Sequence, residues 1–355
     1  MSDRFRIDSH KLSYHILRLH QWLQGKNVYP IYIEIGLHRG CNHQCIFCAF
    51  DFLKYKPQTL DFQKIKRFIL QAKAKGVKAI LYSGEGEPLL HQDAAEIIKF
   101  TRQAGIDVAL ASNGVMLTPE ISRKILPYLS WLKISLNAGT KTTYIKVHKA
   151  KPDDFDLVLG NLKAAVAIKN KHGYPCVIGA QSVLLKDNFH EMEGLAKKLR
   201  ALGLDYLTIK PYSWHCFSQN KLKINFQQPD LLALQKRLQR YSKGKFKVIF
   251  RSNAMAKLNE EKPYLSCLGV SFVAHIADTG NVYPCTVFVG NKKFSFGNIY
   301  SDSFKNIWEG KRRRRVLKEL HRNWDIQRCR KSCRIDEINR YLWELKHPVE
   351  HVNFI

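Results

Sequence analysis

Six short apolar segments alternate with amphipathic segments in the first 215 residues, and this alternation constrains the fold more than any other feature. The apolar segments are rich in Ile, Val, Leu and Tyr, which is typical of parallel strands buried on both faces. Between them the apolar period changes from that of a strand to that of a helix. The predicted strands are IYIEIGL (31–37), KAILYSG (78–84), DVALASNG (107–114), WLKISLNAG (131–139), CVIGAQSVLL (176–185) and DYLTIKPYS (205–213).

The segments between these strands have the features of amphipathic helices. One apolar face is formed by Ile65, Phe68, Ile69 and Ala72, and the segments KAKGVK, RQAGID, KHGYP and RALGLD each place a glycine where a helix would end. Repeated strand–helix units predict an α/β fold, a partial (β/α)6 TIM-like barrel followed by a smaller second region. An open, doubly wound sheet is the alternative.

Cysteine, glycine and polar residues gather directly after the predicted strands. HRGCNHQCIFC follows the first strand and GEGEP the second, while SNG, SLNAG and KPYSWH follow the third, fourth and sixth. Ligands of parallel sheets and barrels collect beyond the carboxyl ends of the strands. We therefore expect an active site at this edge of the sheet.

The motif CNHQCIFC places three cysteines, Cys41, Cys45 and Cys48, within eight residues. Disulfides are not favoured, because the number is odd and the spacing leaves little room for loops. A zinc site usually takes four ligands, and only His43 could serve as a local fourth. An iron–sulfur cluster held by three thiolates, with one iron left open, is the third reading. The motif alone leaves these alternatives open.

Composition and charge narrow the class of protein. The 355 residues are 45% hydrophobic and 25% charged, as in an ordinary globular protein, and no segment has the length and apolar character of a membrane span or a signal peptide. We therefore expect a cytoplasmic location, where clustered cysteines favour metals over disulfides. The net charge is +28, and residues 311–334 contain eleven Lys or Arg. This run has no interleaved aromatic residue before Trp324, so a solvated helix face is favoured over a nucleic-acid groove, which stays possible.

Together, Cys41-x3-Cys45-x2-Cys48 after the first strand and GEGEP after the second resemble the radical S-adenosylmethionine (SAM) enzymes, over roughly residues 30–215. The resemblance implies that the three cysteines hold a [4Fe–4S] cluster whose open iron is chelated by SAM. Reductive cleavage of SAM would then release a 5′-deoxyadenosyl radical. It further implies contacts to SAM from Phe47, Gly84, Glu85, Gly86, Glu87, Ser112, Asn113, Ser135, Asn137, Gln181 and Pro211. Glu85 departs from the family pattern, in which a glycine is common at that position.

A second group of thiols lies near the C-terminus. Cys267, a glycine at 280 and Cys285 are spaced as in the first half of the auxiliary-cluster domains called SPASM or, in the short form, twitch. The resemblance implies that Cys329 and Cys333 complete a four-thiolate set for one auxiliary [4Fe–4S] cluster. Their spacing of Cys-x3-Cys is wider than the usual Cys-x2-Cys. A structural zinc on the same four thiols is the alternative.

Two cysteines stay outside these sets. Cys176 is expected to be a small core residue within a strand. Cys216 and the adjacent His215 follow the sixth strand and are weak candidates for catalytic residues. We expect an N-terminal helical extension (1–29), a radical SAM core (30–215), a helical linker (216–262) and an auxiliary-cluster domain with a tail (263–355).

These features predict a radical SAM enzyme that abstracts a hydrogen atom from a small-molecule substrate, with the auxiliary cluster assisting, and dehydrogenation is the favoured outcome. A sugar or nucleotide-sugar is the favoured substrate, since phosphates suit a basic pocket. The alternatives are a ribosomally made peptide, RNA, or, in another class, a zinc protein that binds nucleic acid. An electron donor such as flavodoxin or ferredoxin is the expected partner.

Overall fold

The computed structural model describes residues 4–53, 57–220 and 222–354. Within these ranges the named strands form one ten-stranded sheet in the order β10-β9-β8-β1-β2-β3-β4-β5-β6-β7. The strands are β1 (Tyr32–Ile35), β2 (Ala79–Tyr82), β3 (Asp107–Ser112), β4 (Trp131–Ser135), β5 (Val177–Leu184), β6 (Tyr206–Pro211), β7 (Lys247–Phe250), β8 (Val273–Ile276), β9 (Asn281–Tyr283) and β10 (Gly297–Asn298). Strands β8 and β1–β7 run parallel, and β9 and β10 are antiparallel to their neighbours.

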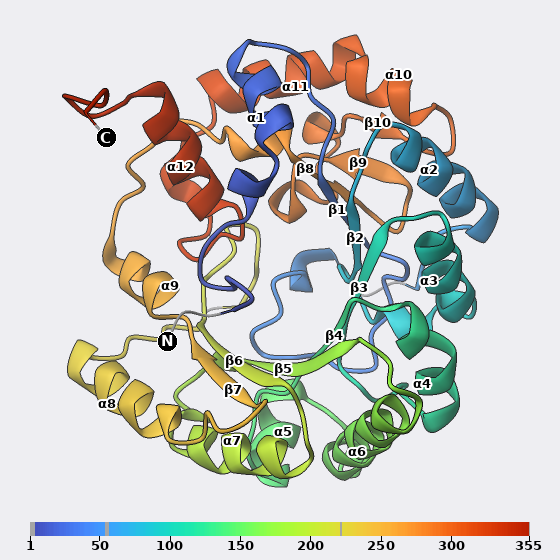
Figure 1. Ribbon diagram of the computed structural model, residues 1–355, viewed down its shortest axis with the longest axis vertical. Coiled ribbons are helices and arrows are strands. Elements are labelled where there is room, and N and C mark those ends of the chain that lie inside the picture. The colour runs from blue at the N-terminus through green and yellow to red at the C-terminus, as the bar shows by residue number, and fades with distance from the viewer. Residues whose placement is uncertain (1–3, 54–56, 221, 355) are drawn as a thin grey trace.

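The sheet curves into a barrel that stays open, because β7 and β10 are its two edges and do not pair with each other (Figure 1). The partial barrel predicted from the sequence is confirmed, and each of the six predicted segments contains one strand. The doubly wound alternative is wrong, because the sheet is curved and the connecting helices α2–α8 lie on its outer, convex face (Figure 1).

Helices precede, connect and follow the strands. They are α1 (Ile16–Leu23), α2 (Phe62–Ala74), α3 (Ala94–Gln103), α4 (Pro119–Ile125), α5 (Lys141–His148), α6 (Asp154–His172), α7 (Met192–Ala201), α8 (Gln228–Gln239), α9 (Ser252–Ala256), α10 (Phe304–Glu309), α11 (Lys311–Arg322) and α12 (Asp336–Lys346). Short 3-10 turns are η1 (Leu12–Tyr14), η2 (Asp51–Leu53), η3 (Pro88–Leu90), η4 (Leu126–Tyr128), η5 (Phe189–Glu191), η6 (Lys257–Asn259), η7 (Gly269–Ser271), η8 (Thr286–Phe288), η9 (Lys292–Phe294) and η10 (Ile326–Arg328).

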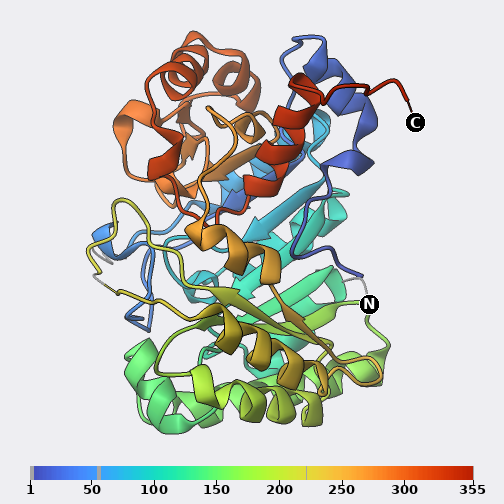
Figure 2. The same ribbon diagram turned by 90° about the vertical axis from the view of Figure 1, so that its left-hand side faces the viewer.

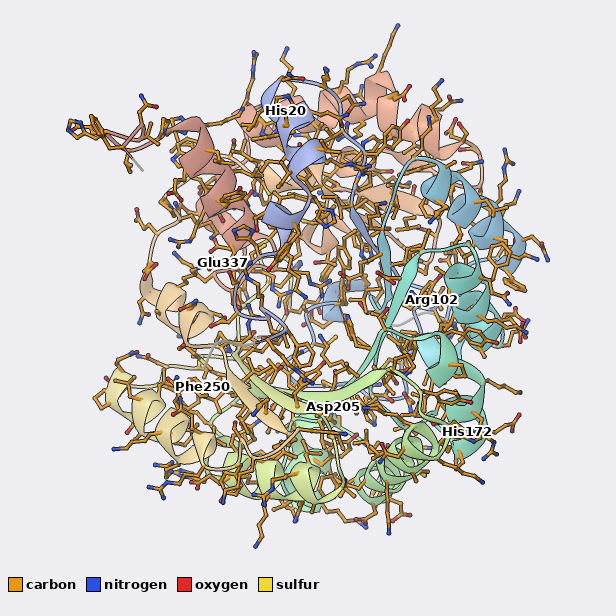
Figure 3. All side chains as sticks on the ribbon, viewed as in Figure 1. His20, Arg102, His172, Asp205, Phe250 and Glu337 are labelled. Carbon is orange, nitrogen blue, oxygen red and sulfur yellow. The ribbon has the colours of Figure 1, made fainter. Side chains whose placement is uncertain are left out.

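Local chemistry explains where the helices of the core begin and how they attach. Asp61 caps α2 by accepting a hydrogen bond from the backbone N–H of Lys64. The apolar face of α2 predicted from its spacing is buried in the structure. Asp205, which precedes β6, accepts from Ile178 N and from Lys169 Nζ, and so ties α6 to the sheet (Figure 3). Arg102 and His172 lie in the last turns of α3 and α6, outside the barrel (Figure 3).

Side chains alternate along the strands between a dry outer face and a polar interior. In β1, Ile33 and Ile35 are buried among the helices, whereas Glu34 points into the barrel. Lys133 of β4 and Gln181 of β5 point inward in the same way. The apolar core therefore lies between the sheet and the outer helices, and the charged residues of the strands are directed toward the centre.

The segment 216–262, predicted as a helical linker, contains more than helix. It forms α8 and α9, but it also contributes β7, which pairs in parallel with β6. The sequence KVIF of β7 is too short to show a clear period, and its formation depends on the open edge that β6 offers. The parallel part of the sheet thus extends beyond the six predicted strands, through β7 at one side and β8 at the other.

The C-terminal region continues the sheet of the core. Its first strand, β8, pairs in parallel with β1, and α10 packs against α2 on one side and α11 on the other (Figures 1 and 2). Trp308 is fully buried, and its Nε1–H donates to the carbonyl of Val28 at 2.7 Å. The basic helix α11 is only partly solvated, because the Arg313 guanidinium lies 3.8 Å from the centroid of the Trp308 ring. Within the described residues no helix has the length and apolar character needed to cross a membrane.

Candidate active site

The loop that follows β1 carries the first three cysteines and touches the loop that follows β2. Cys41, Cys45 and Cys48 are free thiols of intermediate burial. The backbone N–H of Glu87 donates to the carbonyl of Gly40 at 2.9 Å. The cysteine loop and the GEGEP motif (84–88) are therefore held together by their backbones, as a shared site requires.

Gly86 makes this close approach possible. A Cβ atom at this position would lie 2.3 Å from the carbonyl oxygen of Gly40 and 2.4 Å from that of His38. Both distances are far below van der Waals contact, and backbone atoms cannot rotate away as a flexible side chain can. Glycine is thus required where the motif crosses the cysteine loop.

The cysteines of this loop are poorly suited to ionise without a metal. Burial raises the pKa of Cys41 to about 12, and burial together with the neighbouring thiols raises the pKa of Cys45 well above its ordinary value. Thiolates so close together repel one another unless a cation lies among them. A metal cluster supplies that charge and deprotonates its ligands, so the three residues fit the predicted iron–sulfur group.

Glu87 joins the ends of β2 and β3. Its Oε1 accepts from Ser112 Oγ at 2.7 Å and from Leu89 N at 3.1 Å, and its Oε2 accepts from Asn113 N at 2.7 Å. Asn113 Nδ2 in turn donates to Asn42 Oδ1 at 2.6 Å, inside the cysteine loop. The structure therefore brings three predicted SAM contacts together: Glu87, Ser112 and Asn113. The Glu87 carboxylate accepts hydrogen bonds that fix the backbone of these loops.

Glu85 points away from this group and toward the C-terminal region. Its Oε1 lies 2.8 Å from His275 Nε2 of β8, and both side chains are buried. Burial alone would lower the pKa of His275, but the Glu85 carboxylate raises it overall. Gly36 provides the space for this ion pair, since a Cβ there would overlap Glu85 Oε2. Glu85, which stands where the family commonly has a glycine, therefore connects the barrel to the C-terminal region through this ion pair.

Gly84 and Phe47, two further predicted SAM contacts, lie close to these loops. Gly84 adopts a φ of 121°, which favours glycine, and a Cβ there would lie 2.9 Å from Gly36 Cα. The ring of Phe47 meets the ring of His148 edge-on, with their centroids 5.6 Å apart.

The other predicted SAM contacts have different surroundings. Both amide atoms of Asn137 are hydrogen-bonded within the protein, Oδ1 to Val183 N and Nδ2 to His148 Nε2. Ser135 and Pro211 end their strands, β4 and β6. Gln181 lies deeper in the barrel and accepts from Lys133 Nζ at 3.2 Å. Among the described residues, no side-chain hydrogen bond joins these four residues to the group around Glu87.

His215 and Cys216, the weak catalytic candidates, lie between the barrel and the second thiol group. The His215 ring stacks on Phe52 at a centroid distance of 5.3 Å, and its Nδ1 accepts from Phe217 N. Burial and the nearby Arg330 lower its pKa to about 4. Burial, with smaller contributions from Cys333 and Cys216, raises the pKa of Cys329 to about 12. Cys176 is fully buried in the core as predicted, but it directly precedes β5 and does not lie within the strand.

The second thiol group assembles from three segments. Cys267 precedes η7, Cys285 follows β9, and Cys329 and Cys333 lie between α11 and α12. Burial, then the neighbouring thiols, raise the pKa of Cys285 well above its ordinary value. Trp324 Nε1 donates to Cys329 Sγ at 3.1 Å, and Asn339 Nδ2 donates to Cys267 Sγ at 3.4 Å. Converging, partly buried thiols with N–H donors around them fit a cluster with four thiolate ligands.

A chamber of about 310 Å³ lies between the barrel interior and the second thiol group, and Cys285 and Cys333 form part of its wall. Its remaining lining is rich in cations and includes Lys133, Lys210, Arg251, Arg330 and Arg334. Arg251 pairs with Asp8, and Arg334 pairs with Glu34. In the described ranges no acidic side chain lies within ion-pair distance of the other three.

These three cations are held in surroundings that disfavour their charge. Burial, then the charge of Arg334, lower the pKa of Lys133 to about 7. Burial, then Arg330 and other neighbouring cations, lower the pKa of Lys210 well below its ordinary value. Burial also lowers the pKa of Arg330. An anion in the chamber would relieve this repulsion, so the chamber is suited to an anionic ligand.

A second chamber of about 600 Å³ opens at the amino ends of the strands. Its lining is mostly apolar and includes Phe5, Ile80 and Trp131. Lys133 and Gln181 line both chambers, so the two cavities adjoin inside the barrel.

Comparison with known families identifies both halves of the chain. Residues 35–199 match the model of the radical SAM superfamily, and residues 267–334 match that of the SPASM iron–sulfur cluster-binding domain. The chain is a radical SAM enzyme with a SPASM domain. The first domain brings a [4Fe–4S] cluster that works with SAM, and the second brings an additional iron–sulfur cluster, so the recognition and the cofactors predicted from the sequence are confirmed.

Known relatives agree with this assignment. The AdoMet-dependent heme synthase of Methanosarcina barkeri is 27% identical over 328 residues, which cover 86% of this chain and 90% of that protein. An S-adenosylmethionine-dependent nucleotide dehydratase of Lacinutrix mariniflava is 26% identical, but over only 50% of this chain and 39% of its own length. The crystal structure of Streptococcus suis SuiB bound to S-adenosylmethionine matches with a TM-score of 0.66 at 18% identity, covering 95% of this chain and 80% of that one, and so shares the fold.

Several residues of the site escaped the sequence analysis. Lys133 and Lys210 each stand inside an apolar strand segment, WLKISL and LTIKPY, and a lysine in such a position is a usable signal for an inward charge. His148 carries no such signal, whereas His275 stands in a comparable apolar segment, FVAHIA (272–277). Their partners, Cys45 and Glu85, are 103 and 190 residues away, and only the folded chain brings them together.

Gly86→Ala is expected to lower SAM cleavage by more than about tenfold, because the added Cβ displaces the backbone of the cysteine loop at a cost of about 1–3 kcal/mol. The measurement is 5′-deoxyadenosine release from anaerobically reconstituted protein, with iron content determined in parallel. Gly160→Ala in α6 is the matched control, since a Cβ there meets nothing within 4 Å. Equal activity of the two variants would contradict the role given to Gly86.

Glu85→Gln is expected to flatten the pH dependence of stability. The pKa of His275 is raised in the folded chain above its unfolded value near 6.5, so the ion pair stabilises the fold fully below that pH and is lost as pH rises through the folded-state pKa. The denaturation midpoint of the wild type should fall more steeply above about pH 6.5 than that of the variant. His172→Gln, on the exposed end of α6, should keep the wild-type slope. Identical slopes in wild type and Glu85→Gln would refute this role.

Proposed function

We propose that this radical SAM enzyme oxidises an anionic small molecule that binds in the cationic chamber. The observation that carries the proposal is the set of Lys133, Lys210 and Arg330, which face the chamber without acidic partners in the described ranges. Ligand sites commonly combine a cavity of this size with a few convergent polar groups. Within this proposal Cys41, Cys45 and Cys48 bind the core cluster, and the loop carrying Gly86 and Glu87 holds SAM.

The cofactors supply the demanding chemistry. When bound, the core cluster provides the electron that cleaves SAM, and the 5′-deoxyadenosyl radical takes a hydrogen atom from the substrate. The chain contributes an enclosed chamber and cations that orient an anionic group. A donor protein such as flavodoxin or ferredoxin would reduce the core cluster.

The position of the second thiol group suggests which overall reaction follows hydrogen-atom abstraction. Cys285 and Cys333 line the same chamber as the three cations, so a substrate bound there would lie beside the auxiliary cluster. If Cys267, Cys285, Cys329 and Cys333 all bind that cluster, it has no open iron and acts as an electron acceptor. Loss of one hydrogen atom, one electron and one proton, the last to water, converts an alcohol into a carbonyl group. We therefore favour dehydrogenation.

A nucleotide-sugar or another phosphorylated sugar fits this site, because its phosphates would pair with the three cations. The nucleotide dehydratase among the relatives supports a nucleotide-type substrate. A second candidate is a tetrapyrrole carboxylate, since the relative that aligns over most of both chains is a heme synthase. The apolar chamber adjoining the cationic one is the observation that favours it. Likeness to SuiB is a likeness of fold and adds nothing for a peptide substrate.

Removal of the core ligands tests the two-cluster assignment. The variant Cys41→Ala/Cys45→Ala/Cys48→Ala is expected to reduce the iron content from roughly eight to roughly four per chain and to abolish 5′-deoxyadenosine release with dithionite. Iron is measured on anaerobically reconstituted protein. A fall from roughly four to none would leave the radical core and make the second thiol group a zinc or structural site. No iron and no release from the unmodified chain would refute the proposal.

Lys210→Met tests the chamber. Removing a cation that pairs with an anionic group costs about 1.5–3 kcal/mol, so binding of a cognate anion should weaken by about tenfold to a hundredfold. The measurement is calorimetric titration of the SAM-loaded enzyme with UDP-glucose and, separately, with a porphyrin carboxylate. Lys163→Met, at an exposed position of α6, is the control and should bind like the wild type. If wild type and Lys210→Met bind a probe with the same affinity, that probe does not bind in the cationic chamber, and the proposed substrate site is wrong.

A further inference from the structure

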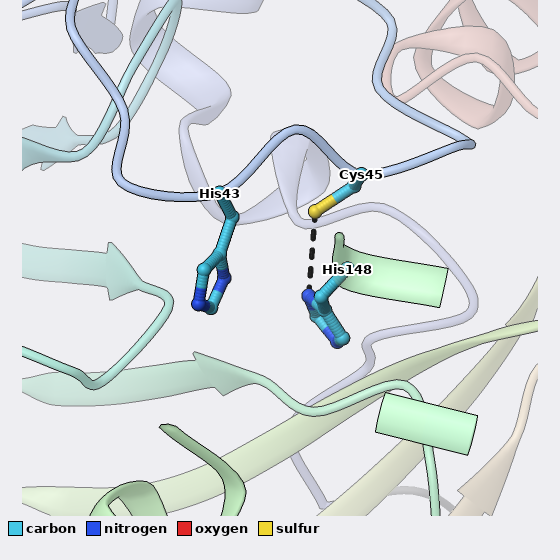
Figure 4. Close-up of side chains that lie close together, drawn as sticks. All are labelled: His43, Cys45 and His148. Atoms are coloured by element: carbon cyan, nitrogen blue, oxygen red, sulfur yellow. Dashed lines mark hydrogen bonds between the residues drawn. The ribbon is translucent and has the colours of Figure 1, made fainter. Parts of the chain in front are cut away.

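A buried histidine outside the proposed catalytic and cluster-binding residues touches the cysteine loop. His148, the last residue of α5, has no exposed surface, and its Nδ1 lies 3.3 Å from Cys45 Sγ (Figure 4). The ring is fixed by its neighbours, since it stacks on Tyr144 with a centroid distance of 4.2 Å and meets the edge of Phe47. The contact to the thiol is therefore set by packing.

The other ring nitrogen determines which atom of His148 carries the proton. The backbone N–H of Asn137 points at His148 Nε2 from 3.2 Å. A backbone amide can only donate, so Nε2 must accept with its lone pair. The side-chain Nδ2 of Asn137 donates to the same atom at 3.3 Å, while its Oδ1 is occupied by Val183 N. The proton of the neutral ring is thus on Nδ1, and Nδ1–H donates to Cys45 Sγ.

We infer that His148 is a positioning residue that donates an N–H···S hydrogen bond to the core cluster through Cys45 and raises its reduction potential. The inference rests on the proposed role of Cys45 as a cluster ligand. Reduction adds negative charge that is spread over the cluster sulfurs, and a donor to a sulfur stabilises that charge, so the potential rises.

A mononuclear metal site is the competing interpretation, because ligand atoms of His43, Cys45 and His148 lie within 4.8 Å of one another (Figure 4). Two contacts argue against it. The Nε2 of His43 is paired with Asp154 Oδ2 at 3.1 Å. The Nδ1 of His148 carries a proton as long as Asn137 donates to Nε2, and a protonated nitrogen cannot bind a metal ion. The arrangement therefore suits donation to a thiolate.

His148→Leu tests the inference, because it removes the donor and keeps a side chain of similar size. The reduction potential of the core cluster is measured by an EPR-monitored redox titration of the full chain, with the core signal identified by its change when SAM is added. We expect the ratio of oxidised to reduced core cluster at a fixed applied potential to rise about tenfold, which corresponds to a fall of about 59 mV. His148→Asn, whose amide nitrogen can take the place of Nδ1, should recover most of this change. His43→Gln, which keeps a partner for Asp154, should leave the potential unchanged.

A second measurement covers the case in which His148→Leu does not load a cluster. Pulsed EPR of the wild type with 15N-labelled histidine should show a histidine nitrogen coupled to the reduced core cluster, and His148→Asn should lose this coupling. An unchanged potential in His148→Leu, or no such coupling in the wild type, overturns the inference. One zinc per chain in the protein as purified, lost in both His148→Leu and His43→Gln, also overturns it in favour of the metal site. A wild type without any SAM-sensitive cluster signal would refute the proposed function itself.

Discussion

The active site depends on one backbone crossing, where the GEGEP motif passes the cysteine loop at Gly86. The motif follows β2 and the loop follows β1, and their backbones join through Glu87 N and the carbonyl of Gly40. The Glu87 carboxylate then binds Ser112 Oγ and the backbone N–H of Asn113, at the end of β3. Three neighbouring strands are thus connected through one short motif. A rigid cysteine loop is the condition for three thiols to bind one metal cluster in a defined orientation.

The C-terminal region is part of the same architecture, because it extends the wall of the barrel. Strand β8 pairs with β1, and His275 on β8 forms a buried ion pair with Glu85 of the GEGEP motif. The segment that carries Cys333 also brings Arg330 and Arg334 to the chamber. The two cysteine groups and the cationic chamber therefore share one continuous framework. Loss of the Glu85–His275 ion pair would disturb both the GEGEP motif and β8.

Two kinds of polar group lie inside this framework, namely the cations of the chamber and the N–H donors beside the cysteines. In the part of the chain that the structure describes, no acidic side chain lies within ion-pair distance of Lys210 or Arg330, so the chamber is suited to an anionic ligand. The cysteines are surrounded by N–H donors such as Trp324 and Asn339 at the second group and His148 at the first. Such donors stabilise negative charge on sulfur, so the same physical device recurs at both thiol groups.

Local patterns in the sequence were sufficient for the partial barrel, for the edge of the sheet that carries the site, and for both groups of cysteines. The alternation of strands and helices and the close spacing of thiols depend on residues that are near one another in the sequence. In the structure, each of the six predicted segments contains its strand. β7 was not predicted, because a four-residue strand has no period of its own and forms only on the edge of β6.

Only the tertiary structure decided the partners of Glu85, His148 and Lys210. Each of these contacts joins segments distant in the chain, and a charged or imidazole side chain is compatible with solvent until the fold buries it. The sequence by itself therefore determined which cofactors the chain can hold. The fold determined which charges face the substrate and which nitrogen faces the cluster, because burial and hydrogen-bond direction exist only once the strands are assembled.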